Sequence, residues 1–197
     1  MTRIFMQLGR LTGPFRSCRL WYSVTRDVHE KVILKRVRPY GSGMSAFDVV
    51  AYAVHLLFAG LWTGSVLFVA YAVLPAARDG ELSAGLLDRF AGKLTTVSRA
   101  SAALLFLTGG HLAAQRYTVD SLTGSLAGYN VLAMLALWFV LAGLVEVGTS
   151  KLTDGTGRDK VREPAAAARP FLLGASATAV LLLFNAGLLF AVVVGLV

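Results

Sequence analysis

The most constraining feature of this sequence is a set of long apolar stretches, each of a length suited to crossing a lipid bilayer. About 20 mostly apolar residues in a helix cover the hydrocarbon core, which is about 30 Å thick. Four such stretches occur, at residues of about 47–74, 95–114, 128–149 and 170–197. The sequence therefore predicts an all-α integral membrane protein, a four-helix bundle formed by residues 44–197.

Two prolines set expected helix boundaries. The first helix is expected to end at Leu74, because Pro75 would remove a hydrogen bond and clash with the preceding turn. The last helix is expected to begin at Pro170, since proline is tolerated in the first turn. The polar segment 150–169 is then expected to be a loop.

Composition supports a membrane protein and locates its positive charge outside the apolar part. Hydrophobic residues make up 56% of the chain and charged residues only 15%, whereas soluble domains have about 25% charged residues. Residues 1–43 hold nine Lys/Arg and two Asp/Glu, a net charge of +7 out of the total of +8. The rest of the chain is nearly neutral, so we expect no nucleic-acid partner.

The basic leader, residues 1–43, admits two interpretations. It resembles a membrane-surface helix attracted to anionic lipid; alternatively, translation starts at Met44 and the leader is an over-extended gene start. The single cysteine, Cys18, lies in the leader, so the apolar domain is expected to have neither a disulfide nor a thiolate ligand.

Loop charges predict the orientation in the membrane, because cytoplasmic loops carry the excess of Lys and Arg. Eight cations flank the loops after the first and third helices: Arg78, Arg89, Lys93, Lys151, Arg158, Lys160, Arg162 and Arg169. The opposite side of the apolar domain holds only Arg116. We therefore expect a multi-pass protein of the cell (plasma or inner) membrane with both termini outside.

Histidines inside the predicted spans are candidate metal ligands, because ionisable residues in a membrane are costly. A rise of 1.5 Å per residue places His55, His111 and Met134 in one layer near the outer surface. Imidazole and thioether suit copper, and imidazole also suits haem iron. The sequence thus predicts a shallow metal site, with ordinary packing of each side chain as the alternative.

Other polar and small residues in the spans are expected to support packing. Arg99 and Glu146 are both expected near the cytoplasmic face, where they would form a structural ion pair. Asn185 is expected to hydrogen-bond between helices, and Gly60 with Gly64 should let another helix approach closely.

The common motifs of soluble catalysis are absent from the sequence. It has no Gly-x-Gly-x-x-Gly, P-loop, His-Glu-x-x-His, Gly-x-Ser-x-Gly or Cys-x-x-Cys pattern. A transport or metal-handling role is therefore favoured over an enzyme.

Two motifs resemble the copper-resistance D (CopD) family. The first is His55 followed by Trp62-Thr-Gly64; the second runs from Arg89-Phe90-Ala-Gly-Lys to Leu107-Thr108-Gly109-Gly110. The resemblance covers residues of about 47–149. It implies copper uptake or tolerance, with copper bound through the histidines and a periplasmic or extracellular copper protein as partner.

Two other functions are considered beside copper handling. One is a haem or redox protein similar to the HemJ-type protoporphyrinogen oxidase, in which His55 and His111 would be axial ligands. The other is a membrane subunit that only packs beside a partner. Each of these functions is compatible with a homo-oligomer.

Overall fold

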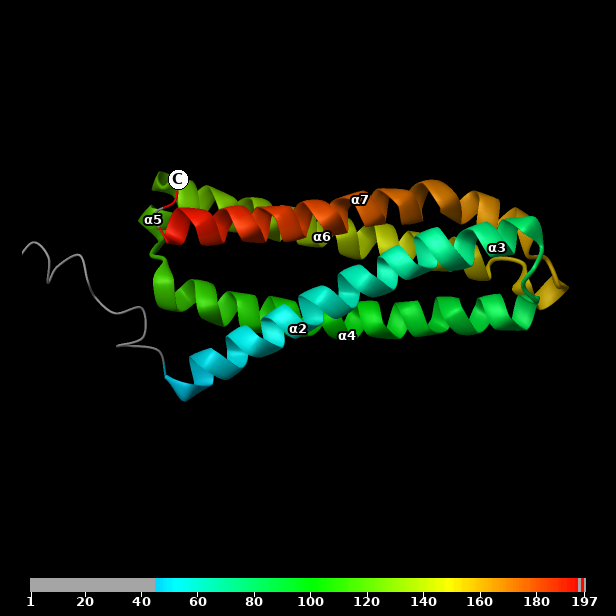
Figure 1. Ribbon diagram of the computed structural model, residues 1–197, viewed down its shortest axis with the longest axis horizontal. Coiled ribbons are helices and arrows are strands. Elements are labelled where there is room, and N and C mark those ends of the chain that lie inside the picture. The colour runs from blue at the N-terminus through cyan, green and yellow to red at the C-terminus, as the bar shows by residue number, and fades with distance from the viewer. Residues whose placement is uncertain (1–44, 195, 197) are drawn as a thin grey trace, which may run out of the picture. The chain divides into compact units, whose positions relative to one another are not determined.

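The computed structural model describes residues 45–194 and 196, and these residues are almost entirely helical, with no strand among them (Figure 1). The leader, with both of its interpretations and Cys18, lies outside the described residues. The elements are α2 (Ala46–Phe68), the π-helix η2 (Val69–Val73), α3 (Leu74–Asp79), α4 (Ala84–Arg116), α5 (Val119–Gly124), α6 (Leu126–Thr153), the short 3₁₀ helix η3 (Thr156–Arg158) and α7 (Arg162–Val193).

Three segments are long and apolar enough to cross a membrane: 46–79, 126–158 and 162–193. They cover all or most of three of the four predicted stretches, which confirms those three as candidate spans. The fourth stretch, 95–114, lies in α4, which has 33 residues but is not among the candidate spans. Arg99, His111 and several Ser, Thr and Gly residues lower its mean hydropathy.

The prediction that the first helix ends before Pro75 is wrong. The helix continues through η2 and α3 to Asp79 and ends at Gly80, which has a left-handed φ of 80°. A proline ring clashes with the carbonyl four residues earlier, and the wider π turn directly before α3 relieves this clash by redirecting the carbonyls there. The proline is therefore accommodated within a long bent span.

The prediction that the last helix begins at Pro170 is also wrong. α7 begins at Arg162, and Pro170 lies inside it. Pro164, not Pro170, occupies the first turn, and the alanines 165–168 have the highest helix propensity. The expected loop 150–169 is therefore shorter in the structure, where residues 154–161 connect α6 to α7.

The long helices pack through regularly spaced apolar faces. α2 contacts α4, α4 contacts α6, and α6 packs most extensively against α7; α2 runs obliquely to the other three (Figure 1). The buried positions of α4 alternate in steps of three and four, as in a coiled coil. They are Ala84, Leu87, Ala91, Leu94, Ser98, Ser101 and Leu105.

Burial is uneven along the bundle. The buried core lies in residues 62–105 and 141–179, which we call the packed half. In the helical segments 46–61, 106–116, 126–140 and 180–194, which we call the loose half, only Ala51 and Gly128 are buried. Large apolar side chains such as Leu57, Phe139 and Phe184 are exposed along this half, as expected for surfaces that contact lipid.

Candidate functional site

His55 lies in the loose half and is held by α4. Its Nδ1 is 2.8 Å from Thr108 Oγ1. The threonine hydroxyl donates its one proton to the Leu104 carbonyl at 2.7 Å, so it accepts the hydrogen bond from Nδ1–H. This arrangement selects the imidazole tautomer in which Nε2 carries the lone pair.

His111 reaches across the same pair of helices in the opposite direction. Its Nε2 is 2.8 Å from Asp48 Oδ1, and its ring meets that of Phe47 edge to face at a centroid distance of 4.9 Å. Because a carboxylate accepts, Nε2 carries a proton and Nδ1 holds the lone pair of the neutral ring. A carboxylate behind an imidazole is the usual support of a metal-ligating histidine.

The two imidazoles share one seam between α2 and α4. Thr108 and His111 are three residues apart on α4, so the points where the histidines meet this helix differ by about 4.5 Å along its axis. Gly109 makes room for the first ring: a Cβ at this position would lie 2.9 Å from His55 Cε1. The two rings therefore lie along one seam, with contact points about one helical turn apart on α4 and, from His55 to Asp48, about two turns apart on α2.

Met134 is half-buried on α6, whereas the histidine seam lies between α2 and α4. Residues 45–194 and 196 contain no group of three or more His, Cys, Asp or Glu side chains arranged to hold a metal ion. The structure thus provides a two-imidazole seam rather than a complete ligand set.

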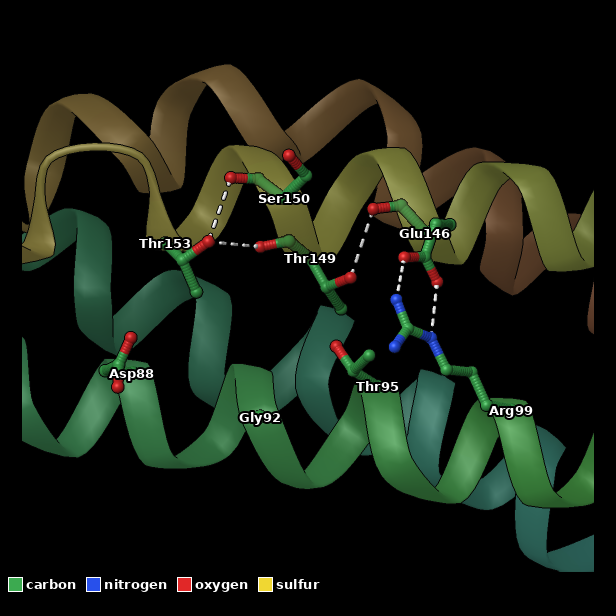
Figure 2. Close-up of a pocket in the computed structure, with 8 residues that line it drawn as sticks. All are labelled: Asp88, Gly92, Thr95, Arg99, Glu146, Thr149, Ser150 and Thr153. Carbon is green, nitrogen blue, oxygen red and sulfur yellow. Dashed lines mark hydrogen bonds and ion pairs between the residues drawn. The ribbon is translucent and has the colours of Figure 1, made fainter.

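Arg99 and Glu146 form an ion pair between α4 and α6 (Figure 2). Arg99 Nε donates to Glu146 Oε2 at 3.2 Å, and Nη2 donates to Oε1. Arg99 lies about four turns into α4, because α4 begins at Ala84 and not near residue 95, where the predicted stretch begins. The side chains are 68% and 52% exposed, so the pair lies at the protein surface and neutralises two charges there.

A polar groove extends from this ion pair along α4 and α6 (Figure 2). Its volume is about 240 Å³. Eight residues line it: Asp88, Gly92, Thr95, Arg99, Glu146, Thr149, Ser150 and Thr153. Apart from the ion pair, none of these residues was expected from the sequence to form a site. Their spacing of three, four or seven along each helix was the available signal, since such residues share one face.

The residues expected to pack the helices behave differently from one another. Asn185 Nδ2 donates to the Asn130 carbonyl at 3.0 Å and so joins α7 to α6. A Cβ at Gly60 or Gly64 would meet nothing within 4 Å, so the expectation of a close helix approach at these glycines fails within the described chain. The close approach occurs instead at Gly148, where a Cβ would lie 2.9 Å from Leu172 Cδ2.

The partners of the histidines were also missed as functional residues. Asp48 precedes His55 by two turns on α2, and Thr108 precedes His111 by almost one turn on α4, so each oxygen lies on the same helix face as the histidine of its own helix. This reciprocal spacing becomes meaningful only once α2 and α4 are known to pack antiparallel.

Comparisons with models of protein families, with curated proteins and with solved structures find no match to this chain.

Proposed function

We propose that α4 is a fourth membrane span and that the loops 80–83 and 154–161, together with the cations on the helix ends beside them, face the cytoplasm. Three observations support this. α4 packs lengthwise between α2 and α6, its 33 residues extend about 50 Å, and Arg99 is paired with Glu146. Pairing relieves the cost of a charge near the membrane. Four spans place both termini on the outer side.

We further propose that the chain is a membrane protein of copper handling, and that His55 and His111 bind the metal. The observation that carries this proposal is the reciprocal fixing of the two rings: each is held through one nitrogen by an oxygen of the facing helix, and each keeps a lone pair on the other nitrogen. Imidazole nitrogen is a good ligand for both copper oxidation states. The resemblance to the CopD family agrees with this assignment.

The residues around the histidines suit reversible loading better than a closed structural site. The seam lies in the loose half, where few side chains are buried, and it supplies two imidazoles, so a bound copper ion would keep positions for an exchanging partner. Asp48 and Thr108 would hold the rings and fix which nitrogen is free. The residues present thus fit a transfer site.

Elemental analysis tests the proposal. Full-length protein purified from copper-supplemented cells is expected to contain about one copper per chain. His55→Gln with His111→Gln should abolish this, while His29→Gln in the leader, the third histidine of the chain, should not. An absorption spectrum is recorded on the same sample. A Soret band that the double change removes would show that the histidines bind haem and not copper. Absence of any bound metal would favour a membrane subunit that only packs beside a partner.

A further inference from the structure

The groove between α4 and α6 lies in the packed half, apart from the histidine seam, and its chemistry does not depend on copper binding. Three of its four hydroxyls, those of the threonines, are already committed as donors. Thr95 Oγ1 donates to the Ala91 carbonyl at 3.0 Å, and Thr149 Oγ1 to the Val145 carbonyl at 2.9 Å. Thr153 Oγ1 donates to the Ser150 carbonyl at 3.1 Å. A hydroxyl has one proton, so these three oxygens can offer only lone pairs to a ligand.

The charges that line the groove add to this acceptor character. Arg99 and Glu146 neutralise each other, which leaves the carboxylate of Asp88. Its partner among the described residues is the Thr156 hydroxyl at 3.5 Å, a long contact. Arg89 and Lys93 follow on the same helix but do not line the groove. The lining therefore carries a net charge of −1, located at the Asp88 end.

The size of the groove indicates more than a bare ion. Asp88 and Arg99 are eleven residues apart on α4, which corresponds to about 16 Å. The volume of about 240 Å³ is several times the roughly 30 Å³ occupied by one water molecule in the liquid. A small organic group can enter, with its charged end at Asp88 and the threonine hydroxyls beside it (Figure 2).

We propose that this groove binds a primary ammonium group, with the Asp88 carboxylate as counter-ion and the hydroxyls of Thr95, Thr149 and Thr153 as hydrogen-bond acceptors. A primary ammonium supplies three N–H donors and one positive charge, which complements an acceptor-lined site of net charge −1. A quaternary ammonium has the same charge but no N–H. The ammonium group can belong to a soluble amine or to an aminophospholipid headgroup.

Two matched cations test the chemistry on the full chain in detergent. Calorimetry should show n-butylammonium binding about tenfold more tightly than tetramethylammonium, the effect of about one charge-assisted hydrogen bond. Asp88→Asn should weaken n-butylammonium binding about tenfold, and Asp120→Asn, the same change on the exposed helix α5, should leave it within about twofold. Equal binding of the two cations, or an unchanged Kd for Asp88→Asn, overturns the proposal.

A second pair of variants covers the case in which Asp88→Asn does not fold. Thr149→Val keeps the shape of a groove residue and removes its acceptor, whereas Thr96→Val makes the same change at a residue of α4 that does not line the groove. The first should weaken n-butylammonium binding severalfold and the second should not. Equal effects of the two changes would contradict the assignment.

Lipid nanodiscs distinguish the two sources of the ammonium group. Phosphatidylethanolamine retained in preference to phosphatidylcholine, and released by n-butylammonium, identifies the headgroup as the ligand. Binding of n-butylammonium without lipid preference identifies a soluble amine. If inorganic phosphate binds in place of the amine, the groove recognises anions through Arg99 and the proposal is wrong.

Discussion

At the scale of single residues, the histidines are defined by the oxygen that each one meets. Thr108 must accept from His55 because its own proton goes to Leu104, and Asp48 accepts from His111 because a carboxylate has no proton to give. These two contacts fix the orientation of a pair of half-buried rings. The proposed copper function depends on that orientation.

The partner of His111 provides the first prediction. Asp48→Asn keeps the size of the side chain but removes the negative charge that makes the ring a better ligand, so copper affinity should fall about 10- to 100-fold. Competition with a colorimetric copper chelator measures this. Asp120→Asn is the control, since Asp120 lies on the exposed helix α5. Equal copper affinity in the wild type and Asp48→Asn would show that the carboxylate does not support a ligand.

The ion pair between α4 and α6 provides the second prediction. Arg99→Met and Glu146→Gln each leave one charge without its partner, whereas the double variant leaves none. The Tm in detergent should therefore fall in each single variant and recover in the double variant. Arg78→Met, which removes an exposed cation from α3, should change little. Additive losses would mean that the two side chains do not act as a pair.

At the scale of elements, the apolar stretches predicted helices correctly because a bilayer demands length and hydropathy that are visible in the sequence. The boundaries failed at Pro75 and Pro170, since a π turn and an alanine-rich start, respectively, let helices continue where proline usually ends them. The expected contact between Arg99 and Glu146 is present, although Arg99 lies about four turns into α4 rather than near its start.

The rest of the candidate site depended on which helix faces which. The contacts of Asp48 with His111 and of Thr108 with His55 require α2 to pack against α4 in one register. The groove requires the polar faces of α4 and α6 to meet. Neither pairing can be predicted from the periodicity of one helix. The apolar and polar faces of each helix differ only weakly, so several helices could have been its neighbour.

Packing between α6 and α7 gives the third prediction. Gly148 lies against Leu172, so Gly148→Leu should destabilise the protein by about 1–3 kcal/mol through overpacking. Gly143→Leu is the matched control, because a Cβ there meets nothing within 4 Å and its effect should stay below about 0.5 kcal/mol. Denaturant titration in mixed micelles measures both. Similar losses at the two glycines would argue against the close α6–α7 contact.

At the scale of the whole molecule, the bundle combines a packed half with a loose half. The packed half contains nearly all buried side chains and the polar groove, and the loose half contains the histidine seam and much of the exposed apolar surface. The proposed copper site therefore lies in the loose half, and the proposed ammonium site lies in the packed half. A half with this dense burial can anchor the helices while the other half exchanges a ligand.

The number of spans gives the fourth prediction. In a Cys18→Ser background, Glu81→Cys and Asp154→Cys should react with a membrane-impermeant maleimide only in inverted vesicles, and Asp120→Cys only in intact cells. This pattern requires α4 to cross the membrane, since Glu81 precedes it and Asp120 follows it. Labelling of Glu81→Cys and Asp120→Cys from the same side would reduce the number of spans to three.

The most direct measurement of the copper proposal is X-ray absorption spectroscopy of the copper-loaded, full-length protein. We expect the scattering of two imidazole rings around the metal in the wild type and its loss when His55 and His111 are both changed to Gln. A copper environment without imidazole, or one that the double change leaves intact, would contradict the assignment of these two histidines as the ligands.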